Sequence, residues 1–197
     1  MKRTHKAVAV AVVIGVIITV LVGCGPQDQG SAPQAAEQEA TDTSQQAQDS
    51  EQEPAELQVV DGAVVIEMQA SRGRNYNTPI GLHVEPGTTI RFMNMSGMHS
   101  TTAYHPDNGR ELRIPEGAEA WDSGMMTGRG QSFEVTLTVE GVYDYYCIPH
   151  EAMGHVGRII VGDPDAAPVG PADNLPAAAR NALPAVDQIM AEHVVLP

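Results

Sequence analysis

The chain has 197 residues, a formal net charge of −14 and two cysteines. This length allows one ordinary domain with additional segments, and two cysteines exclude a disulfide framework. Lysine does not occur after Lys6, and a strongly acidic chain repels polyanions. We therefore expect no nucleic-acid partner.

Residues 1–23 have the pattern of an export signal. Three basic residues precede an apolar run over 7–22, and small residues then lead to Cys24. This order is typical of a lipoprotein signal peptide, so we expect cleavage before Cys24 and its lipidation. The alternative is an uncleaved anchor, although the run is shorter than the roughly 20 residues of a spanning helix. Both predict an extracytoplasmic, membrane-anchored protein, on the periplasmic or cell-surface side.

Residues 24–56 have the composition of a flexible linker. The stretch 27–56 carries eight acidic residues, no basic residue and no aromatic residue. Such a segment cannot bury enough apolar surface to fold. We therefore predict a lipidated cysteine followed by a disordered acidic linker.

Residues 57–162 have the pattern of a β-sandwich. Short β-branched runs, several of them alternating polar with apolar residues, are separated by turn signals such as Pro106-Asp107-Asn108-Gly109. The runs lie at 59–60, 64–66, 88–92, 133–139 and 158–161. Short strands at these intervals predict an all-β, antiparallel sandwich.

Residues 163–197 form a segment rich in proline and alanine, with a possible helix near 177–193. Its apolar side chains recur at near-helical spacing, but Pro184 would break or kink the helix unless the helix starts there. We expect a helix packed on the sandwich or a frayed tail. The alternative is a helix that docks a partner.

The stretch 143–155 places a thiol, two imidazoles and a thioether in one loop behind a predicted strand. Cys147 and His150 are separated by two residues, and Pro149 stiffens the turn, so both side chains can face one ion. Soft sulfur beside imidazole suits copper or zinc, and a Cys-His-His set with a weak axial ligand holds blue copper. An exported free thiol is open to oxidation unless it is buried or metal-bound. Cys147 therefore needs an explanation, and the alternative to a metal ligand is a buried, inert thiol.

The remaining imidazole must come from elsewhere in the sandwich. His99 follows the predicted strand 88–94, where a loop could bring it against the Cys147 loop. His105 is the competing candidate. The other histidines fall in the signal peptide, before a turn or in the tail, at His5, His83 and His193.

These residues resemble the blue copper proteins, or cupredoxins, and especially pseudoazurin, halocyanin and plastocyanin. The resemblance covers roughly 57–162 and is carried by 141–150 and by His99. The segment 113–123 is similar to a pseudoazurin segment at the same place. The resemblance implies a Greek-key sandwich with one type 1 copper, which carries one electron by switching between Cu(II) and Cu(I).

The resemblance leaves the axial ligand open. Pseudoazurin and plastocyanin place a methionine five residues after the loop histidine, where this chain has His155. Amicyanin places it three residues after, where this chain has Met153. The long connection to the closing strand favours His155. An imidazole binds Cu(II) more strongly than a thioether does, so His155 predicts a lower potential and a colour shifted from blue towards green or red.

The resemblance also implies the surroundings of the copper. His150 would be the electron port, with Met98, Pro149 and Met153 as candidates for an apolar patch around it. Backbone amides would donate to Cys147, and Asn94 is a candidate partner for the free ring nitrogen of His99.

We expect an electron carrier rather than an enzyme, because the sequence offers no second cupredoxin domain. Its partners would be a redox donor and acceptor, such as a cytochrome or a terminal oxidase or reductase. The alternative is an extracytoplasmic copper chaperone or storage lipoprotein, because several methionines could bind Cu(I). These methionines are Met93, Met95, Met98, Met125 and Met126.

Overall fold

The computed structural model describes residues 57–197, so the predicted signal peptide, Cys24 and the acidic linker lie outside the described residues. Within 57–197, no helix combines the length and apolar character needed to cross a membrane. The strands are β1 (Val59–Val60), β2 (Ala63–Ser71), β3 (Arg74–Thr78), β4 (Gly81–Val84), β5 (Thr88–Asn94), β6 (Thr102–Ala103), β7 (Ser132–Leu137), β8 (Gly141–Tyr146), β9 (Val156–Val161) and β10 (Val194–Val195). The helices are the short 3₁₀ turns η1 (Pro106–Asn108) and η2 (Glu151–Met153), and α1 (Ala177–Ala182) and α2 (Val186–Glu192).

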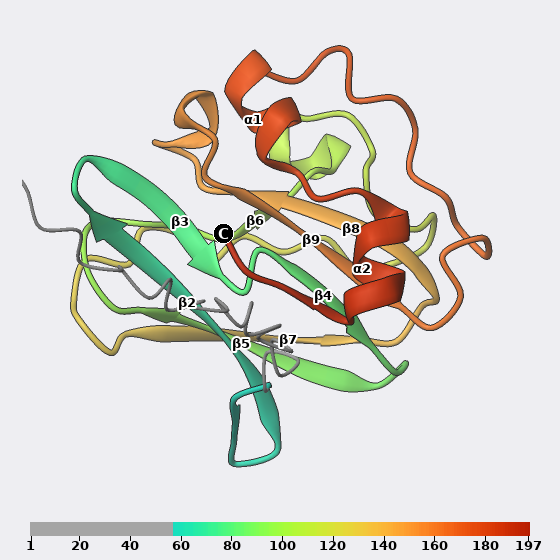
Figure 1. Cartoon of the computed structure of the whole chain (residues 1–197), viewed down its shortest axis with the longest axis horizontal. Helices are drawn as coiled ribbons and strands as arrows, with labels where there is room; N and C mark the ends of the chain where they lie inside the picture. Colours follow the sequence, from blue (N-terminus) through green and yellow to red (C-terminus); the bar gives the residue numbers. More distant parts are fainter. Residues whose placement is uncertain (1–56) are drawn as a thin grey trace, which may run out of the picture. The chain divides into compact units, whose positions relative to one another are not determined.

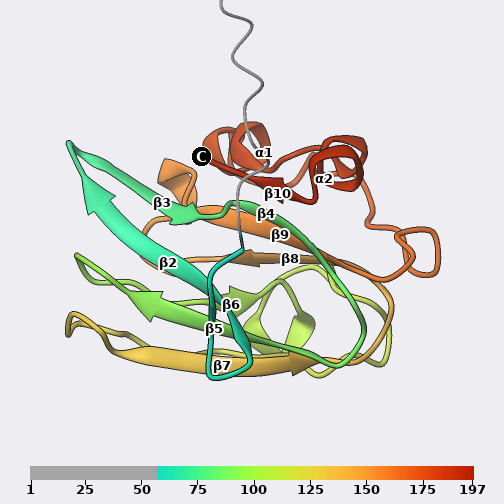
Figure 2. The ribbon, with the colours of Figure 1, turned by 60° about the horizontal axis from the view of Figure 1, so that its bottom comes forward.

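The strands form two stacked sheets, which Figure 2 shows from the side. One sheet has the order β1-β2-β5-β7, with β3 also paired to β2, and the other has the order β10-β4-β9-β8-β6. The predicted all-β sandwich is confirmed, but the purely antiparallel arrangement is wrong. β2 pairs with β5 in parallel, and β4 pairs with β9 in parallel, because the neighbours in each pair are joined by a crossover rather than by a hairpin.

The core lies between the sheets and follows from the alternation of side chains along each strand. In β5, Ile90 and Phe92 are fully buried, and the residues between them are partly exposed. Phe92 contacts the aromatic rings of Trp121 and Tyr145 from the facing side of the sandwich. In contrast, every residue of β8 and β9 is buried, so these two strands are covered on both faces.

The C-terminal segment provides the second cover. Figures 1 and 2 show α1 and α2 over the outer face of the sheet that contains β4, β9 and β8. There Ile189 packs with Val142 and Ile160, and β10 extends the sheet by pairing with β4. Pro184 falls between the two helices, so the break expected at this proline is present. The tail packs on the sandwich.

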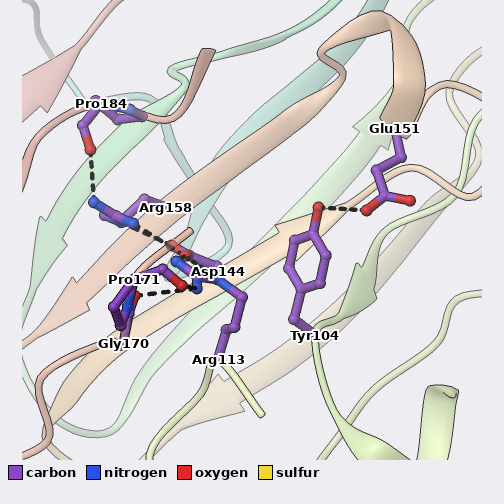
Figure 3. A network of polar contacts seen from close by, with 8 residues as sticks. All are labelled: Tyr104, Arg113, Asp144, Glu151, Arg158, Gly170, Pro171 and Pro184. Atoms are coloured by element: carbon purple, nitrogen blue, oxygen red, sulfur yellow. Dashed lines mark hydrogen bonds and ion pairs between the residues drawn. The ribbon is translucent and has the colours of Figure 1, made fainter. Parts of the chain in front are cut away.

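A buried network of charges fixes this tail to the sandwich (Figure 3). Asp144 on β8 accepts hydrogen bonds from Arg158 Nε at 2.7 Å and Arg113 Nη2 at 2.8 Å. The two guanidinium groups also donate to tail carbonyls: Arg113 to Gly170 and Pro171, and Arg158 to Pro184. Removing one member of such a buried pair lowers the free energy of unfolding by about 3–5 kcal/mol, because a buried charge is left without its partner.

Candidate metal centre

Four side chains from two parts of the chain converge at one end of the sandwich. Cys147 follows β8 directly, His150 and His155 flank η2, and His99 lies between β5 and β6. One ligand atom from each of the four lies within 4.8 Å of all the others. The backbone holds this arrangement: His99 forms an isolated bridge with Met126, and Cys147 N–H donates to the His155 carbonyl at 3.0 Å.

Cys147 is the centre of the cluster. Its side chain is buried, and Sγ lies 3.5 Å from His150 Nδ1 and 3.8 Å from His99 Nδ1. The backbone N–H of Ser100 donates to Sγ at 3.3 Å, so a backbone amide beside the sulfur is present as expected. Burial raises the pKa of the thiol, and this hydrogen bond opposes the rise. A bound cation would favour the thiolate further.

His99 is buried with its ring orientation fixed. Nε2 lies 2.8 Å from the Ser96 carbonyl, which can only accept, so Nε2 carries the proton and Nδ1 presents a lone pair to Cys147. The expectation that Asn94 holds this nitrogen is wrong. The Asn94 amide instead donates to three backbone carbonyls, those of Gly97, Met126 and Gly128.

His150 is the most accessible of the three imidazoles. It is half-buried, whereas His99 and His155 are both fully buried. Burial lowers the pKa of His150, which favours the neutral ring that metals bind. Two large apolar side chains of the predicted patch, Met98 and Met153, are exposed, and so is Ile148 within the loop.

His155 lies in the cluster, while Met153 is 57% exposed. His155 Nε2 is 2.9 Å from Asn77 Oδ1, and within residues 57–197 its Nδ1 is buried without any hydrogen-bond partner. The pKa of His155 falls to about 3, first through burial and then through the neighbouring His99 and His150. The ring is therefore neutral at ordinary pH.

The histidine that competed with His99 lies elsewhere. His105 caps η1 through its Nδ1, which accepts from Asp107 N–H. His83 and His193 contact each other, with 3.0 Å between their Nδ1 atoms.

The donor set fits copper. A thiol and three imidazoles meet in one cluster, and all of them except His150 are fully buried. Thiolate with imidazole is the ligand chemistry of copper and zinc. The unpaired Nδ1 of His155 supports a metal site more strongly than the donor types do, because an unsatisfied buried polar atom costs about 1–3 kcal/mol. A metal ion at the cluster would use that lone pair.

The profile of the plastocyanin/azurin family of copper-binding proteins matches residues 63–162. This chain belongs to that family. Copper is accordingly the cofactor of this cupredoxin, and His99, Cys147, His150 and His155 form a group of side chains that could hold a metal ion.

Similar proteins include plant plastocyanins and a bacterial pseudoazurin. Chloroplast plastocyanin of Pisum sativum is 31% identical over 104 residues, which are 50% of this chain and 59% of that protein. Plastocyanin B'/B'' of Nicotiana tabacum is 31% identical over 88 residues, 42% of this chain and 84% of that protein. Pseudoazurin of Methylobacterium extorquens, at 24% identity and a TM-score of 0.50, covers 64% of this chain and 95% of its own, and shows the fold. The chain spans about 59% of the length of the pea plastocyanin.

Sequence reasoning missed two buried residues that support the candidate ligand loop, Asn77 and Glu151. Asn77 lies on β3, 78 positions before His155, and no periodicity connects the two. Glu151, next to His150, is buried and forms an ion pair with Arg110 and a hydrogen bond with Tyr104. A charged residue within a metal-binding loop was the one available signal, because burial of a carboxylate requires a partner.

Proposed function

We propose that this cupredoxin is a membrane-tethered carrier of single electrons, with copper bound by Cys147, His99, His150 and His155. The carrying observation is the convergence of one thiol and three imidazoles within 4.8 Å. Membership of the copper-binding family supports the proposal. The proposal takes His155 rather than Met153 as the axial ligand. The burial of His155 in the cluster and the 57% exposure of Met153 support this choice.

The bound copper supplies the chemistry, a reversible exchange of one electron between Cu(II) and Cu(I). The chain's own residues hold the donors in place. Hydrogen bonds orient His99 and His155, and the Ser100 N–H orients the Cys147 sulfur. Because these contacts form within a packed core, the ligands stay fixed when the charge of the metal changes. A rigid donor set of this kind needs little reorganisation during electron transfer.

His150 is the proposed route for the electron. Its ring is half-buried. Ile148 and Met153, near it in sequence, and Met98, next to His99, expose apolar side chains. An apolar surface suits brief contact with a redox protein, since it can be desolvated without loss of charge pairing. We propose that the donor and the acceptor, such as a cytochrome or a terminal oxidase or reductase, bind at this end.

The visible and electron-paramagnetic-resonance spectra of the copper-loaded full chain test this function. We expect intense absorption from charge transfer between thiolate and copper, reversible through cycles of reduction and oxidation. Cys147→Ser should abolish the band, and His105→Gln, outside the cluster, should keep it. Retained colour in Cys147→Ser would refute the ligand set.

The membrane tether is a separate proposal that rests on the sequence around Cys24. Lipidation there would hold the domain on the extracytoplasmic side through the acidic linker of 24–56. Cys24→Ser should release the protein from the membrane fraction of the cell. Continued membrane association would support an uncleaved anchor instead.

Exposed methionines favour a second candidate, a copper chaperone or storage function. Met98, Met125 and Met153 are all more than 40% exposed, and thioethers bind Cu(I). A chaperone would surrender Cu(I) to a competing chelator within minutes, while a carrier would retain it through redox cycles. Measuring copper retention with a Cu(I) chelator distinguishes the two functions.

A further inference from the structure

The Asn77 side chain joins three parts of the chain at the copper end of the sandwich. It lies on β3 and is 2% exposed. Its Nδ2 donates to the Val156 carbonyl at 2.9 Å, and its Oδ1 lies 2.9 Å from His155 Nε2. Both polar groups of the amide are therefore used.

These two contacts determine the orientation of the amide. A carbonyl oxygen can only accept, so the atom of Asn77 that faces Val156 must be the NH₂ group. The atom that faces His155 is then the carbonyl oxygen, which also only accepts. His155 must donate to it, and so its proton resides on Nε2.

The tautomer of His155 follows directly. A neutral imidazole carries one proton, so a proton on Nε2 leaves a lone pair on Nδ1. That Nδ1 has no hydrogen-bond partner within residues 57–197, and the His155 ring lies 4.6 Å from the His99 ring and 6.0 Å from the His150 ring, between centroids. The lone pair therefore belongs to the metal-binding cluster.

We propose that Asn77 is the positioning residue for the axial ligand: it selects the Nε2–H tautomer of His155 and directs Nδ1 to copper. The proposal deepens the proposed function and rests on it. Ser96 does the same for His99 through a backbone carbonyl, which a side-chain substitution cannot remove. Asn77 is the support that mutagenesis can remove.

A merely structural asparagine would differ in a measurable way. The hydrogen bond to Val156 alone would suffice to tie β3 to β9, and it would leave the His155 proton free to exchange between the two nitrogens. Removing the partner of a metal-ligating histidine typically costs 10- to 100-fold in metal affinity. The positioning role therefore predicts linked changes in tautomer, affinity and spectrum.

The first test needs no copper. ¹⁵N nuclear magnetic resonance of the metal-free full chain should show His155 as the Nε2–H tautomer. Asn77→Leu, which has a similar size and no acceptor, should introduce the Nδ1–H tautomer, while Asn77→Asp, which retains an acceptor, should keep Nε2–H. A wild-type His155 protonated at Nδ1, or an unchanged tautomer in Asn77→Leu, would overturn the proposal.

The second test uses Cu(II). Asn77→Leu should lower Cu(II) affinity about 10- to 100-fold and shift the visible spectrum in the direction that His155→Met does. Asn75→Leu, two residues away on the same strand and partly exposed, should change neither. In a His155→Met background, Asn77→Leu should have no further spectral effect. An equal effect in that background would refute the proposal.

The design separates the two proposals. If wild type lacks the thiolate band, the proposed function fails, and the tautomer measurement still stands. If wild type has the band and Asn77→Leu matches it in affinity and spectrum, only the positioning role fails. If Asn77→Leu does not fold, the wild-type tautomer and Asn77→Asp decide.

Discussion

Strand β8 connects two buried polar clusters that differ in one respect. Asp144 accepts from Arg113 and Arg158, whose remaining contacts reach tail carbonyls, so the charged groups of this cluster are paired with one another (Figure 3). Three residues later, Cys147 lies among three imidazoles, and His155 Nδ1 has no partner in the described part of the chain.

The presence or absence of an unpaired buried atom distinguishes a structural cluster from a candidate binding site. Burying a polar atom without a partner costs free energy, so a cluster left incomplete is retained for something that completes it. The Asp144 cluster is complete within the protein and ties the tail to the sandwich. The Cys147 cluster has an unpaired donor atom, and we propose that copper completes it. Within residues 57–197, two other buried side-chain atoms also lack partners, Asn94 Oδ1 and Tyr145 Oη, but neither belongs to the group of candidate metal-ligating side chains.

Breaking the complete cluster should have the largest effect on stability. Asp144→Ala leaves two buried guanidinium groups without their carboxylate, so the free energy of unfolding should fall by about 3–5 kcal/mol. Urea unfolding of the metal-free protein measures this. Glu134→Ala, which removes an exposed partner of Arg91, is the control and should cost far less. A loss from Asp144→Ala no larger than this control would show that the network does not hold the tail.

Filling the incomplete cluster should stabilise the fold. A metal that binds the native state at a free concentration 1,000 times its Kd adds about 4 kcal/mol. We expect Cu(II) to raise the free energy of unfolding of wild type by this amount and to have little effect on Cys147→Ser. Urea unfolding with and without Cu(II) measures the gain, and an equal gain in Cys147→Ser would place the binding elsewhere.

The stability of the metal-free protein should fall in acid because His155 is buried as a neutral ring. The pKa of His155 is about 3 in the folded chain and 6.5 as its ordinary value, so the unfolded state binds more protons between these pH values. Stability therefore falls as the pH falls from about 6.5 towards 3, with a slope of at most about 1.4 kcal/mol per pH unit from this residue. His155→Met should flatten the pH dependence of unfolding. An unchanged slope would mean that His155 is not buried as a neutral ring.

The smallest effect is expected where the tail meets the ligand loop. Gly154 has φ +87°, and a Cβ there would lie 3.1 Å from the Ala178 carbonyl oxygen of α1. Gly154→Ala should cost about 1–3 kcal/mol through strain and crowding. Gly87→Ala, at φ +89° with nothing within 4 Å, carries the same backbone strain alone. Thermal unfolding compares the two; equal losses would show that α1 does not brace the loop.

The sequence predicted what is local and missed what is distant. Cys147, His150 and His155 lie within one loop, so their sequence spacing alone indicated a metal site. His99 could be identified from the sequence because it follows a strand with alternating polar and apolar residues. Asn77 was not, since its contact with His155 depends on how β3 folds back beside β9, which no pattern of either strand encodes.

The tail shows the same limit. Pro184 predicted a break in the helix expected near 177–193, and the structure has two helices, one on either side of it. Arg113, Asp144 and Arg158 gave no comparable signal, because charged residues in strands usually face water. In the fold, Asp144 accepts hydrogen bonds from both guanidinium groups. The carbonyls of Gly170, Pro171 and Pro184 accept further hydrogen bonds from the two arginines.

The short strand β10 has a consequence for how the protein behaves among copies of itself. It occupies the edge of β4 through the pairs Val194–Leu82 and Val195–Gly81. A chain shortened at residue 162 would present the unpaired N–H and C=O groups of β4 beside the bare apolar side chains of Val142 and Ile160. Exposed strand edges of this kind recruit other strands. Residues 194–195 therefore cover an edge of the sheet that would otherwise be open to edge-to-edge association.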